Sequence, residues 1–395
     1  MDQRNKSNKL LGWKNILILL CLILIILIIF RVFINFNDFG LDNNVFCGAV
    51  SSFSNGDDPY YVSNLEKYSG NVFPFVYFPL TLIFFIPLCL FKTVLIYLMC
   101  WVILLLFIFL IAKKIDRFQG NGDTLFLITI LITGFATMYE NLLSGNVGLV
   151  EGFLFSIVLL ALVKGRYYLS SIILGMIASL KIFPLLFGGL FLFGKRILKK
   201  KVWTIILFVV GFLAIHLISA MLFPEFTGSY IKTITGTMEG QFRLQEETGG
   251  CNPSSYVFLK EAVFSFTQNN ILFYLIYASF CLLIAIFFVY RLKNHKDLFF
   301  NHFCLGILGI MLIWTRLKPY SFVWALLPIY FLTKNSSIIK KILVIMVISM
   351  APNISILLGG YIFPILRNTI WLSYTSFFSL LLVYIILIFN TPLNQ

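Results

Sequence analysis

The chain has 395 residues, of which 60% are hydrophobic and 12% are charged, and its formal net charge is +14. This composition, with a mean hydropathy of +0.95, excludes the soluble globular proteins as a class. Many apolar runs reach the ~20 residues that an α-helix needs to cross ~30 Å of hydrocarbon, and they lack the alternation of barrel strands. We therefore predict an all-α polytopic membrane protein, a single domain over residues 1–395 with about 11 to 13 transmembrane helices.

Short loops between the apolar runs carry most of the basic residues, which is the topology signal of the positive-inside rule and no sign of nucleic-acid binding. The first run, 16–34, follows a basic stretch and precedes no small-residue cleavage site, so we expect an uncleaved span with a cytoplasmic N-terminus. In this multi-pass protein of the cell membrane, loops 35–79 and 223–270 then lie outside. The loops expected inside are 113–117, 164–166, 195–201, 291–296 and 334–341.

Two segments fit this topology only with short or re-entrant helices. Residues 77–110 must make one net crossing although they contain two apolar runs, and residues 168–193 lie between two loops expected inside. At 1.5 Å per residue, each arm of the second segment reaches roughly 20 Å, which is less than the hydrocarbon thickness. Such backbone is tolerated at membrane depth where it is buried in protein or lines a wet cavity.

The first outer loop, 35–79, is acidic and rich in aromatic residues, with five of the sixteen acidic residues of the chain. Asp38 and Asp42 are four residues apart, so they share a face if this stretch is helical. A carboxylate near the water interface can act as a general base on a sugar hydroxyl. It could also bind a cation, although no second group of oxygen ligands is evident. The simplest alternative is that both are polar loop residues.

Lys181 is the candidate that membrane energetics single out. It lies in the middle of the segment 168–193, and an ionisable group at membrane depth costs roughly 2.5–3.5 kcal/mol on insertion scales. An ammonium is a suitable partner for a phosphate group. The alternatives are that Lys181 reaches to an interface or pairs with a carboxylate such as Glu140 or Glu151. Pro184 would break the helix close by.

Further candidates lie at the predicted outer ends of spans. Arg316 and Lys318 could bind a donor phosphate or stabilise a leaving phosphate, or they could anchor the chain at the membrane interface. Asn146 could hydrogen-bond a sugar hydroxyl or cap a helix. Aromatic rings could stack on a sugar, although an aromatic belt explains any single ring equally well. The rings in question are those of Tyr60, Tyr77, Tyr320 and Trp324.

The cysteines and histidines give little functional signal. Most of the seven cysteines lie inside apolar runs, and we interpret these as small apolar side chains. Cys47 and Cys251 both fall in predicted outer loops and could form a disulfide, although sequence alone does not fix connectivity. The three histidines lack the spacing of a zinc site, so no metal site or cofactor is predicted.

Several short motifs follow one another along the chain. The first outer loop contains Asp42-Asn-Asn-Val-Phe, Gly48-Ala-Val, the turn 55–60 and Phe75-Val-Tyr-Phe-Pro. Gly145-Asn146, Lys181-Ile-Phe-Pro184 and Cys251-Asn252-Pro-Ser come later. This series resembles the polyprenol-phosphate-dependent mannosyltransferases of glycosyltransferase family 87, which have the GT-C architecture. The resemblance covers roughly residues 15–330.

The resemblance implies a GT-C-like helical bundle and an inverting transfer at the outer face. A polyprenyl-phosphate sugar would be the donor, a glycolipid or glycan the acceptor, and mannose the expected hexose. Asp42 would be the general base, with Asp38 as the second choice, and Asn252 would belong to the donor-binding set. The late Pro-x-x-Trp-x-His element of some members occurs here only as residues 318–324, without the histidine.

Two other functions compete with a glycosyltransferase. A lipid or polysaccharide transporter or flippase would have charged residues paired near the bilayer midplane and often an internal repeat. An O-antigen ligase or polysaccharide polymerase would rely on arginine and histidine in its outer loops. The acidic residues of this chain gather instead in its outer loops, which favours the glycosyltransferase.

Overall fold

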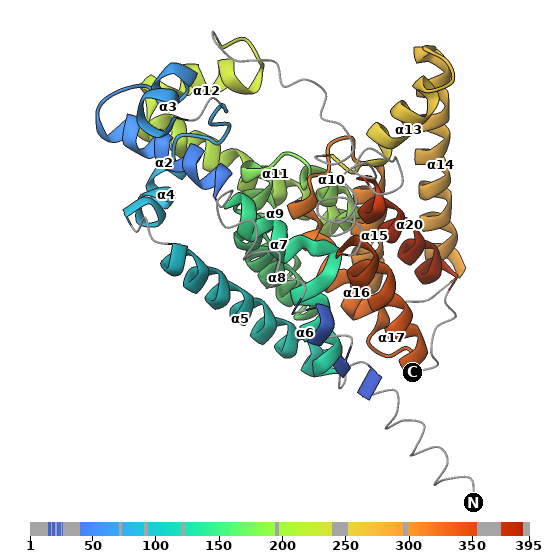
Figure 1. Ribbon diagram of the computed structural model, residues 1–395. Coiled ribbons are helices and arrows are strands. Elements are labelled where there is room, and N and C mark those ends of the chain that lie inside the picture. The colour runs from blue at the N-terminus through green and yellow to red at the C-terminus, as the bar shows by residue number, and fades with distance from the viewer. Residues whose placement is uncertain are drawn as a thin grey trace, which may run out of the picture.

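A computed structural model describes residues 40–70, 73–90, 94–119, 123–193, 197–238, 252–294, 299–353 and 373–389, together with short pieces between 15 and 26. Within these ranges the chain forms seventeen α-helices and no strand (Figure 1). The prediction of an all-α protein is therefore confirmed. The number of helices that cross the membrane stays a prediction.

The first outer loop and the helix that follows it fold together as a small helical unit, which we call the outer-loop unit. It consists of α2 (Leu41–Ser54), α3 (Val62–Ser69) and α4 (Thr81–Leu90), and α12 (Pro224–Ile234) of the second outer loop lies beside it (Figure 1). Its core is separate from that of the main bundle and contains both aromatic and aliphatic side chains. The rings of Phe46 and Phe85 stack with centroids 4.2 Å apart, which joins α2 to α4. A carboxylate on Asp58 accepts a hydrogen bond from Ser229 of α12 at 2.5 Å.

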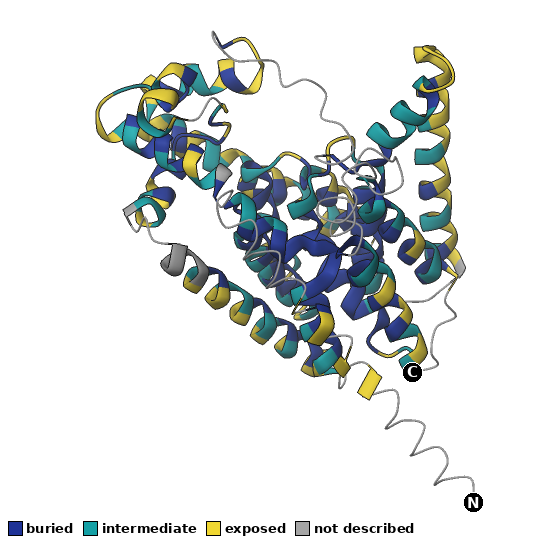
Figure 2. Ribbon diagram, in the orientation of Figure 1, coloured by how far each residue is buried: buried dark blue, intermediate teal, exposed yellow. Residues whose placement is uncertain are grey.

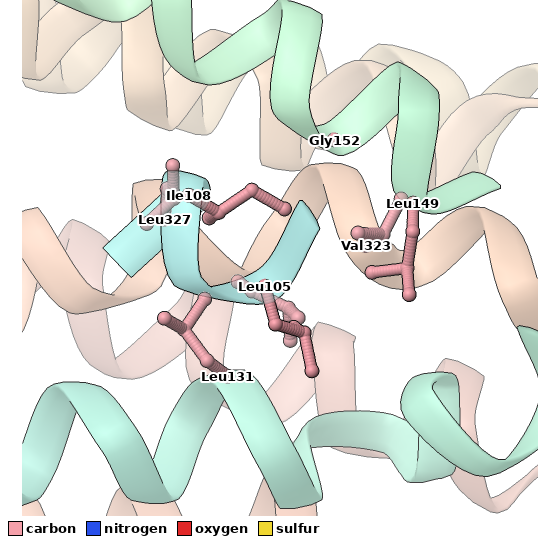
Figure 3. A pocket seen from close by; sticks show the side chains of 8 residues that line it. Leu105, Ile108, Leu131, Leu149, Gly152, Val323 and Leu327 are labelled. Atoms are coloured by element: carbon pink, nitrogen blue, oxygen red, sulfur yellow. The ribbon is translucent and has the colours of Figure 1, made fainter. Parts of the chain in front are cut away.

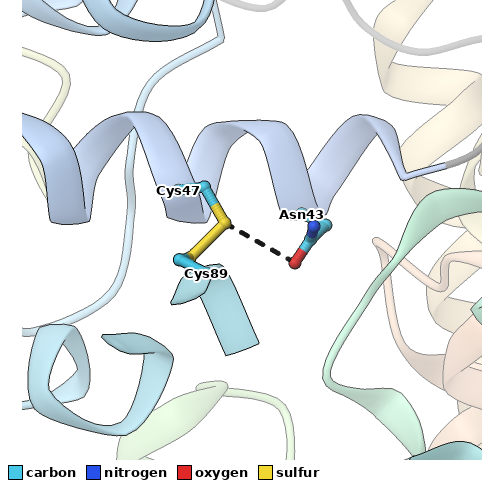
Figure 4. Close-up of a disulfide and its surroundings, with 3 residues drawn as sticks. All are labelled: Asn43, Cys47 and Cys89. Atoms are coloured by element: carbon cyan, nitrogen blue, oxygen red, sulfur yellow. Dashed lines mark hydrogen bonds between the residues drawn. A yellow bond between two sulfur atoms is a disulfide. The ribbon is translucent and has the colours of Figure 1, made fainter. Parts of the chain in front are cut away.

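A disulfide between Cys47 and Cys89 fastens α2 to α4 (Figure 4). The two Cα atoms are 5.2 Å apart and the two residues are separated by 42 positions in the sequence. The pairing of Cys47 with Cys251, which the sequence left open, is therefore not the one that forms. Cys251 itself lies outside the described residues. Cys89 lies in an apolar run, where a cysteine looks like a small apolar residue, so the sequence did not indicate it as the partner of Cys47.

The remaining helices form the main bundle, whose core extends through α6, α8, α15, α16 and α20. Figure 2 shows these central helices as the most deeply buried part of the chain. The bundle contains α5 (Val94–Gln119), α6 (Thr124–Thr133), α7 (Thr137–Ser144), α8 (Gly148–Val163), α9 (Tyr167–Leu180), α10 (Leu185–Gly188), α11 (Leu198–Leu222), α13 (Ser255–Phe264), α14 (Asn270–Asn294), α15 (Phe299–Ile313), α16 (Val323–Thr333), α17 (Ile338–Ile345) and α20 (Thr375–Ile388). Short 3-10 turns η2 (Gly134–Ala136), η3 (Gly189–Phe193) and η4 (Pro319–Phe322) and the π-helical turn η5 (Met346–Met350) connect or extend them.

Helices α11 and α14 leave long apolar faces uncovered by protein (Figure 2). Large apolar side chains such as Met221 on α11 and Ile271 on α14 are 81% and 73% exposed. Both helices, together with the continuous segment 124–144, are long and apolar enough to cross a membrane. Uncovered apolar faces of this length are stable only in contact with lipid hydrocarbon, so the protein is a polytopic membrane protein.

The segment 168–193 contains short helices, as expected. Helix α9 has 14 residues and is about 21 Å long, and α10 follows after a break at residues 181–184. Helix α9 packs closely against α11 because both have a glycine at their crossing. A Cβ on Gly175 would meet the carbonyl oxygen of Phe208, and one on Gly211 that of Ile172. Small residues at a crossing let membrane helices approach backbone to backbone.

Basic loops that the sequence places on one side of the membrane do lie together. Asp116, near the end of α5, accepts from Lys334 at 2.7 Å and from the hydroxyl of Tyr330 at 3.1 Å. Lys341 lies 3.8 Å from Asp123, the residue before α6. These ion pairs join the end of α5 and the start of α6 to residues 334–341 at one end of the bundle. The assignment of that end to the cytoplasm stays a prediction.

The disulfide yields a prediction about the outer-loop unit. Replacing both cysteines (Cys47→Ser/Cys89→Ser) should destabilise the protein by about 2–4 kcal/mol, because a long loop is released in the unfolded chain. The midpoint of thermal unfolding in detergent should fall, while Cys100→Ser, which alters a free thiol on α5, should leave it within a degree or so. Alkylation of Cys47 in unreduced wild-type protein would contradict the disulfide.

Candidate active site

Asp42 lies half-buried in the first turn of α2, where this helix meets the turn between α7 and α8. The backbone N–H of Gly40 donates to the carbonyl of Leu143 over 2.7 Å, which fixes the start of α2 to the end of α7. Gly145 has a φ of +72°, and a Cβ there would lie 2.7 Å from the Cβ of Asn43. A glycine at 145 therefore allows both the left-handed turn and the close approach of α2.

Asn146 links Asp42 to the main bundle. Its Nδ2 donates to Oδ2 of Asp42 over 2.7 Å. Its Oδ1 accepts from the backbone N–H of Gly148 at 3.1 Å and from Nζ of Lys181 at 3.2 Å. Because a carbonyl oxygen with two donors beside it must be the acceptor end of the amide, the NH₂ group has to face Asp42. Asn146 also caps α8 in part, since Gly148 is the first residue of that helix.

Lys181 stands at the end of α9, where its extended backbone (φ −142° and ψ 134°) separates this helix from α10. Its Nζ lies 2.8 Å from Oε1 of Glu151, which is in the first turn of α8 and has no solvent exposure. The other oxygen of Glu151 accepts from Nε1 of Trp324 at 3.1 Å. Of the alternatives left open for Lys181, the structure therefore contains the pair with Glu151. The lysine side chain remains 17% exposed, so a ligand can still reach it.

Asp42, Asn146, Lys181 and Glu151 thus form one connected polar network, to which α2, the α7–α8 turn, the α9–α10 break and α8 each contribute. Buried polar groups in an apolar bundle require hydrogen-bonding partners, and this network supplies them across four segments. Asp42, Asn146 and Lys181 are three of the candidate site residues predicted from the sequence. Glu151 is predicted only as a possible partner of Lys181.

Besides Trp324, two of the proposed aromatic residues border the network. The ring of Tyr320 lies with its centroid 4.5 Å from Nζ of Lys181, which is a cation–π contact. Burial raises the pKa of Tyr77 well above its usual range, and the charges of Glu151 and Asp42 act in the same direction. Tyr77 is therefore a neutral phenol that can donate a proton in a hydrogen bond but cannot act as the base.

Tyr60 has a structural position in the outer-loop unit. Its ring is fully buried, and its hydroxyl donates to the backbone carbonyl of Tyr77 over 2.6 Å. The faces of the ring are covered by neighbouring side chains, among them Phe75 and Tyr230. In this arrangement Tyr60 supports the loop that carries Tyr77 and does not offer a face for a sugar to stack on.

Asn252 holds the segment that carries the proposed phosphate-binding bases. Its Oδ1 accepts from the backbone N–H of Leu317 at 2.8 Å, and its Nδ2 donates to the carbonyl of Thr315 at 3.3 Å. Both ends of the amide are thus bound to backbone on either side of Arg316, which is exposed. Lys318, half-buried, follows directly and precedes the turn η4 that contains Tyr320. Asn252 therefore positions these bases through the backbone.

Asp38, the second choice for the base, lies outside the described residues. Across the described ranges, no three His, Cys, Asp or Glu side chains come together as metal ligands.

An apolar crevice lies next to the polar network (Figure 3). Gly152, which lines it, follows Glu151 on α8, and Val323, on the opposite wall, precedes Trp324 on α16. A Cβ on Gly152 would lie 2.7 Å from Cγ2 of Val323, so the glycine lets the two helices pack closely. The rest of the lining is aliphatic and consists of Leu105, Ile108, Leu131, Leu149, Leu326 and Leu327.

Comparison with known proteins identifies the family. Residues 75–315 match the sequence model of glycosyltransferase family 87, which is more than half of the 395-residue chain. The matched segment contains Asn146, Glu151, Lys181 and Asn252 and begins after Asp42, which the structure joins to it through Asn146. No curated protein and no solved structure matches the chain. The family match decides against a transporter, although the buried ion pairs would also suit one.

The glycine that begins α8 yields a prediction about the network. A Cβ on Gly148 would lie 2.3 Å from Oδ1 of Asn141, a buried side chain already held by two backbone carbonyls. Gly148→Ala should therefore displace the α7–α8 turn and destabilise the protein by about 1–3 kcal/mol, as overpacking does. Thermal unfolding in detergent measures this.

Gly189→Ala is the matched control, because nothing lies within 4 Å of a Cβ at that position. It should leave the unfolding midpoint unchanged or slightly higher. Equal midpoints for the two alanine variants would contradict the packing described for the α7–α8 turn.

Proposed function

We propose that this chain, which belongs to glycosyltransferase family 87 and is a membrane glycosyltransferase, uses a polyprenyl-phosphate hexose as its donor. The acceptor is a lipid-linked or polysaccharide glycan at the extracytoplasmic face, and mannose is the hexose that the motif resemblance favours. The observation that carries the proposal is the hydrogen bond between Asp42 and Asn146, because it joins a carboxylate of the first outer loop to the site of Lys181.

Asp42 acts as the general base in this proposal. The acceptor hydroxyl attacks the anomeric carbon from the side opposite the phosphate, and its proton passes to the carboxylate of Asp42. The bond between the anomeric carbon and the phosphate oxygen breaks, and polyprenyl phosphate leaves with the electron pair. The configuration at the anomeric carbon is inverted. Asn146 supports this role by fixing the orientation of the carboxylate through Oδ2.

Lys181 meets the phosphate of the donor. Its ammonium forms an ion pair with a buried carboxylate and, like Asp42, hydrogen-bonds to the amide of Asn146, so the base and the cation are one side chain apart. Negative charge grows on the phosphate as the bond breaks, and a fixed ammonium stabilises that charge. Arg316 and Lys318, on the segment positioned by Asn252, contribute further positive charge where the leaving group departs.

The hydrocarbon tail of the donor needs an apolar path beside the phosphate site. The crevice between α5, α6, α8 and α16 has an aliphatic lining next to Glu151 along α8, but it has room for no more than about one water molecule. The tail therefore lies in the surrounding lipid in this proposal, where each buried methylene group is worth about 0.8 kcal/mol.

The base assignment is tested with Asp42→Asn, which keeps the size of the side chain and can still accept the hydrogen bond from Asn146. Transfer of hexose from a synthetic short-chain polyprenyl-phosphate mannose should fall by about 10²–10⁴-fold, the usual contribution of a general base. Donor binding should change little, because Asp42 acts on the acceptor.

Asp57→Asn is the matched control in the same loop. Asp57 is occupied by an exposed ion pair with Lys67 at 2.9 Å, away from the network. This variant should keep near-normal turnover. If Asp42→Asn turns over at the wild-type rate, Asp42 is not the base.

A further inference from the structure

Glu151 is the one carboxylate of the polar network that has no contact with solvent. Each of its oxygens is occupied by a different element: Oε1 by the ammonium of Lys181 at 2.8 Å and Oε2 by the indole N–H of Trp324 at 3.1 Å. A side chain enclosed in this way cannot touch a substrate. Any effect of Glu151 on the reaction has to pass through the residues it holds.

Lys181 is the residue through which Glu151 can act. An ammonium has three N–H donors. One is directed to Oδ1 of Asn146, the nitrogen forms its ion pair with Oε1 of Glu151 at 2.8 Å, and the ring of Tyr320 lies against the same group. The lysine side chain keeps 17% of its surface exposed, whereas Glu151 has none. A negatively charged ligand can therefore contact the ammonium of Lys181 but not the carboxylate of Glu151 that balances its charge.

The geometry has two consequences for the site. A lysine side chain has four rotatable bonds, and an unpaired ammonium would turn toward water and away from the membrane interior. The pair with Glu151 prevents this, because leaving the buried carboxylate uncompensated costs more than the pair itself is worth. Lys181 in turn occupies Oδ1 of Asn146, which directs the amide N–H toward Asp42.

We propose that Glu151 is a positioning residue that fixes the ammonium of Lys181 for the phosphate of the donor and, through Asn146, the orientation of Asp42. The proposal rests on the function proposed above and adds a residue that never touches the substrate. Trp324 has the same kind of role one step further away, since its indole N–H orients the carboxylate of Glu151.

The first experiment measures binding of a short-chain polyprenyl phosphate and of the neutral polyprenol of the same length to the purified protein. Glu151→Gln removes the charge, and its amide oxygen can still accept the hydrogen bond from Trp324. Binding of the phosphate should weaken by roughly tenfold or more, as expected for the loss of a charge-assisted hydrogen bond. Binding of the neutral alcohol should not change, because it does not use the ammonium.

Four further variants separate positioning from general damage. Glu151→Asp keeps the charge on a shorter side chain and should recover part of the affinity for the phosphate. In a double-mutant cycle with Lys181→Met, the variant carrying both changes should bind the phosphate no more weakly than Lys181→Met alone. Glu66→Gln, on the exposed side of α3, is the carboxylate control and should bind like the wild type.

The outcomes distinguish the two proposals. If wild-type protein binds the phosphate no better than the neutral alcohol, the proposed donor is wrong. If wild-type protein prefers the phosphate and Glu151→Gln keeps that preference in full, the donor stands and the positioning role of Glu151 is wrong. Equal weakening of both ligands in Glu151→Gln, or additive losses in the double variant, would also overturn the positioning role.

Discussion

The ion pair between Glu151 and Lys181 is the contact on which the site depends. It places a charge that membrane hydrocarbon disfavours at the point where α9 ends and the chain turns toward α10. A buried carboxylate and a lysine that still reaches solvent satisfy each other, and the lysine then orders Asn146. Because Asn146 holds Asp42, one ion pair in the bundle determines the geometry of a carboxylate contributed by the first outer loop.

The outer-loop unit holds Asp42 beside Asn146. Its core of aromatic and aliphatic side chains and the disulfide between Cys47 and Cys89 hold α2 against α4. The start of α2 is joined to the α7–α8 turn by the hydrogen bond from Gly40, and Gly145 leaves room for it. The loop therefore acts as a wall of the site, a role that its acidic and aromatic composition indicates.

The sequence predicts which residues matter better than it predicts their partners. Lys181 could be selected because it is an ionisable group within an apolar segment, whereas Asp42 and Asn146 stand in short motifs that resemble those of the family. The choice of Glu151 over Glu140 depends on how α7 and α8 are turned relative to the break at Lys181, which no local pattern reveals. The partner of Cys47 was missed for the same reason, since Cys89 looks like any small apolar residue in a helix. Tyr60 was expected at a sugar, and only the packing of the loop shows that its hydroxyl supports the backbone of Tyr77.

The most direct measurement is an experimental structure of the protein with a non-transferable phosphonate analogue of a polyprenyl-phosphate hexose. The phosphonate should lie within hydrogen-bond distance of Lys181, and the anomeric carbon should lie close to Asp42. An analogue bound at the other end of the bundle, near Asp116 and Lys334, with no contact to Lys181, would contradict the account.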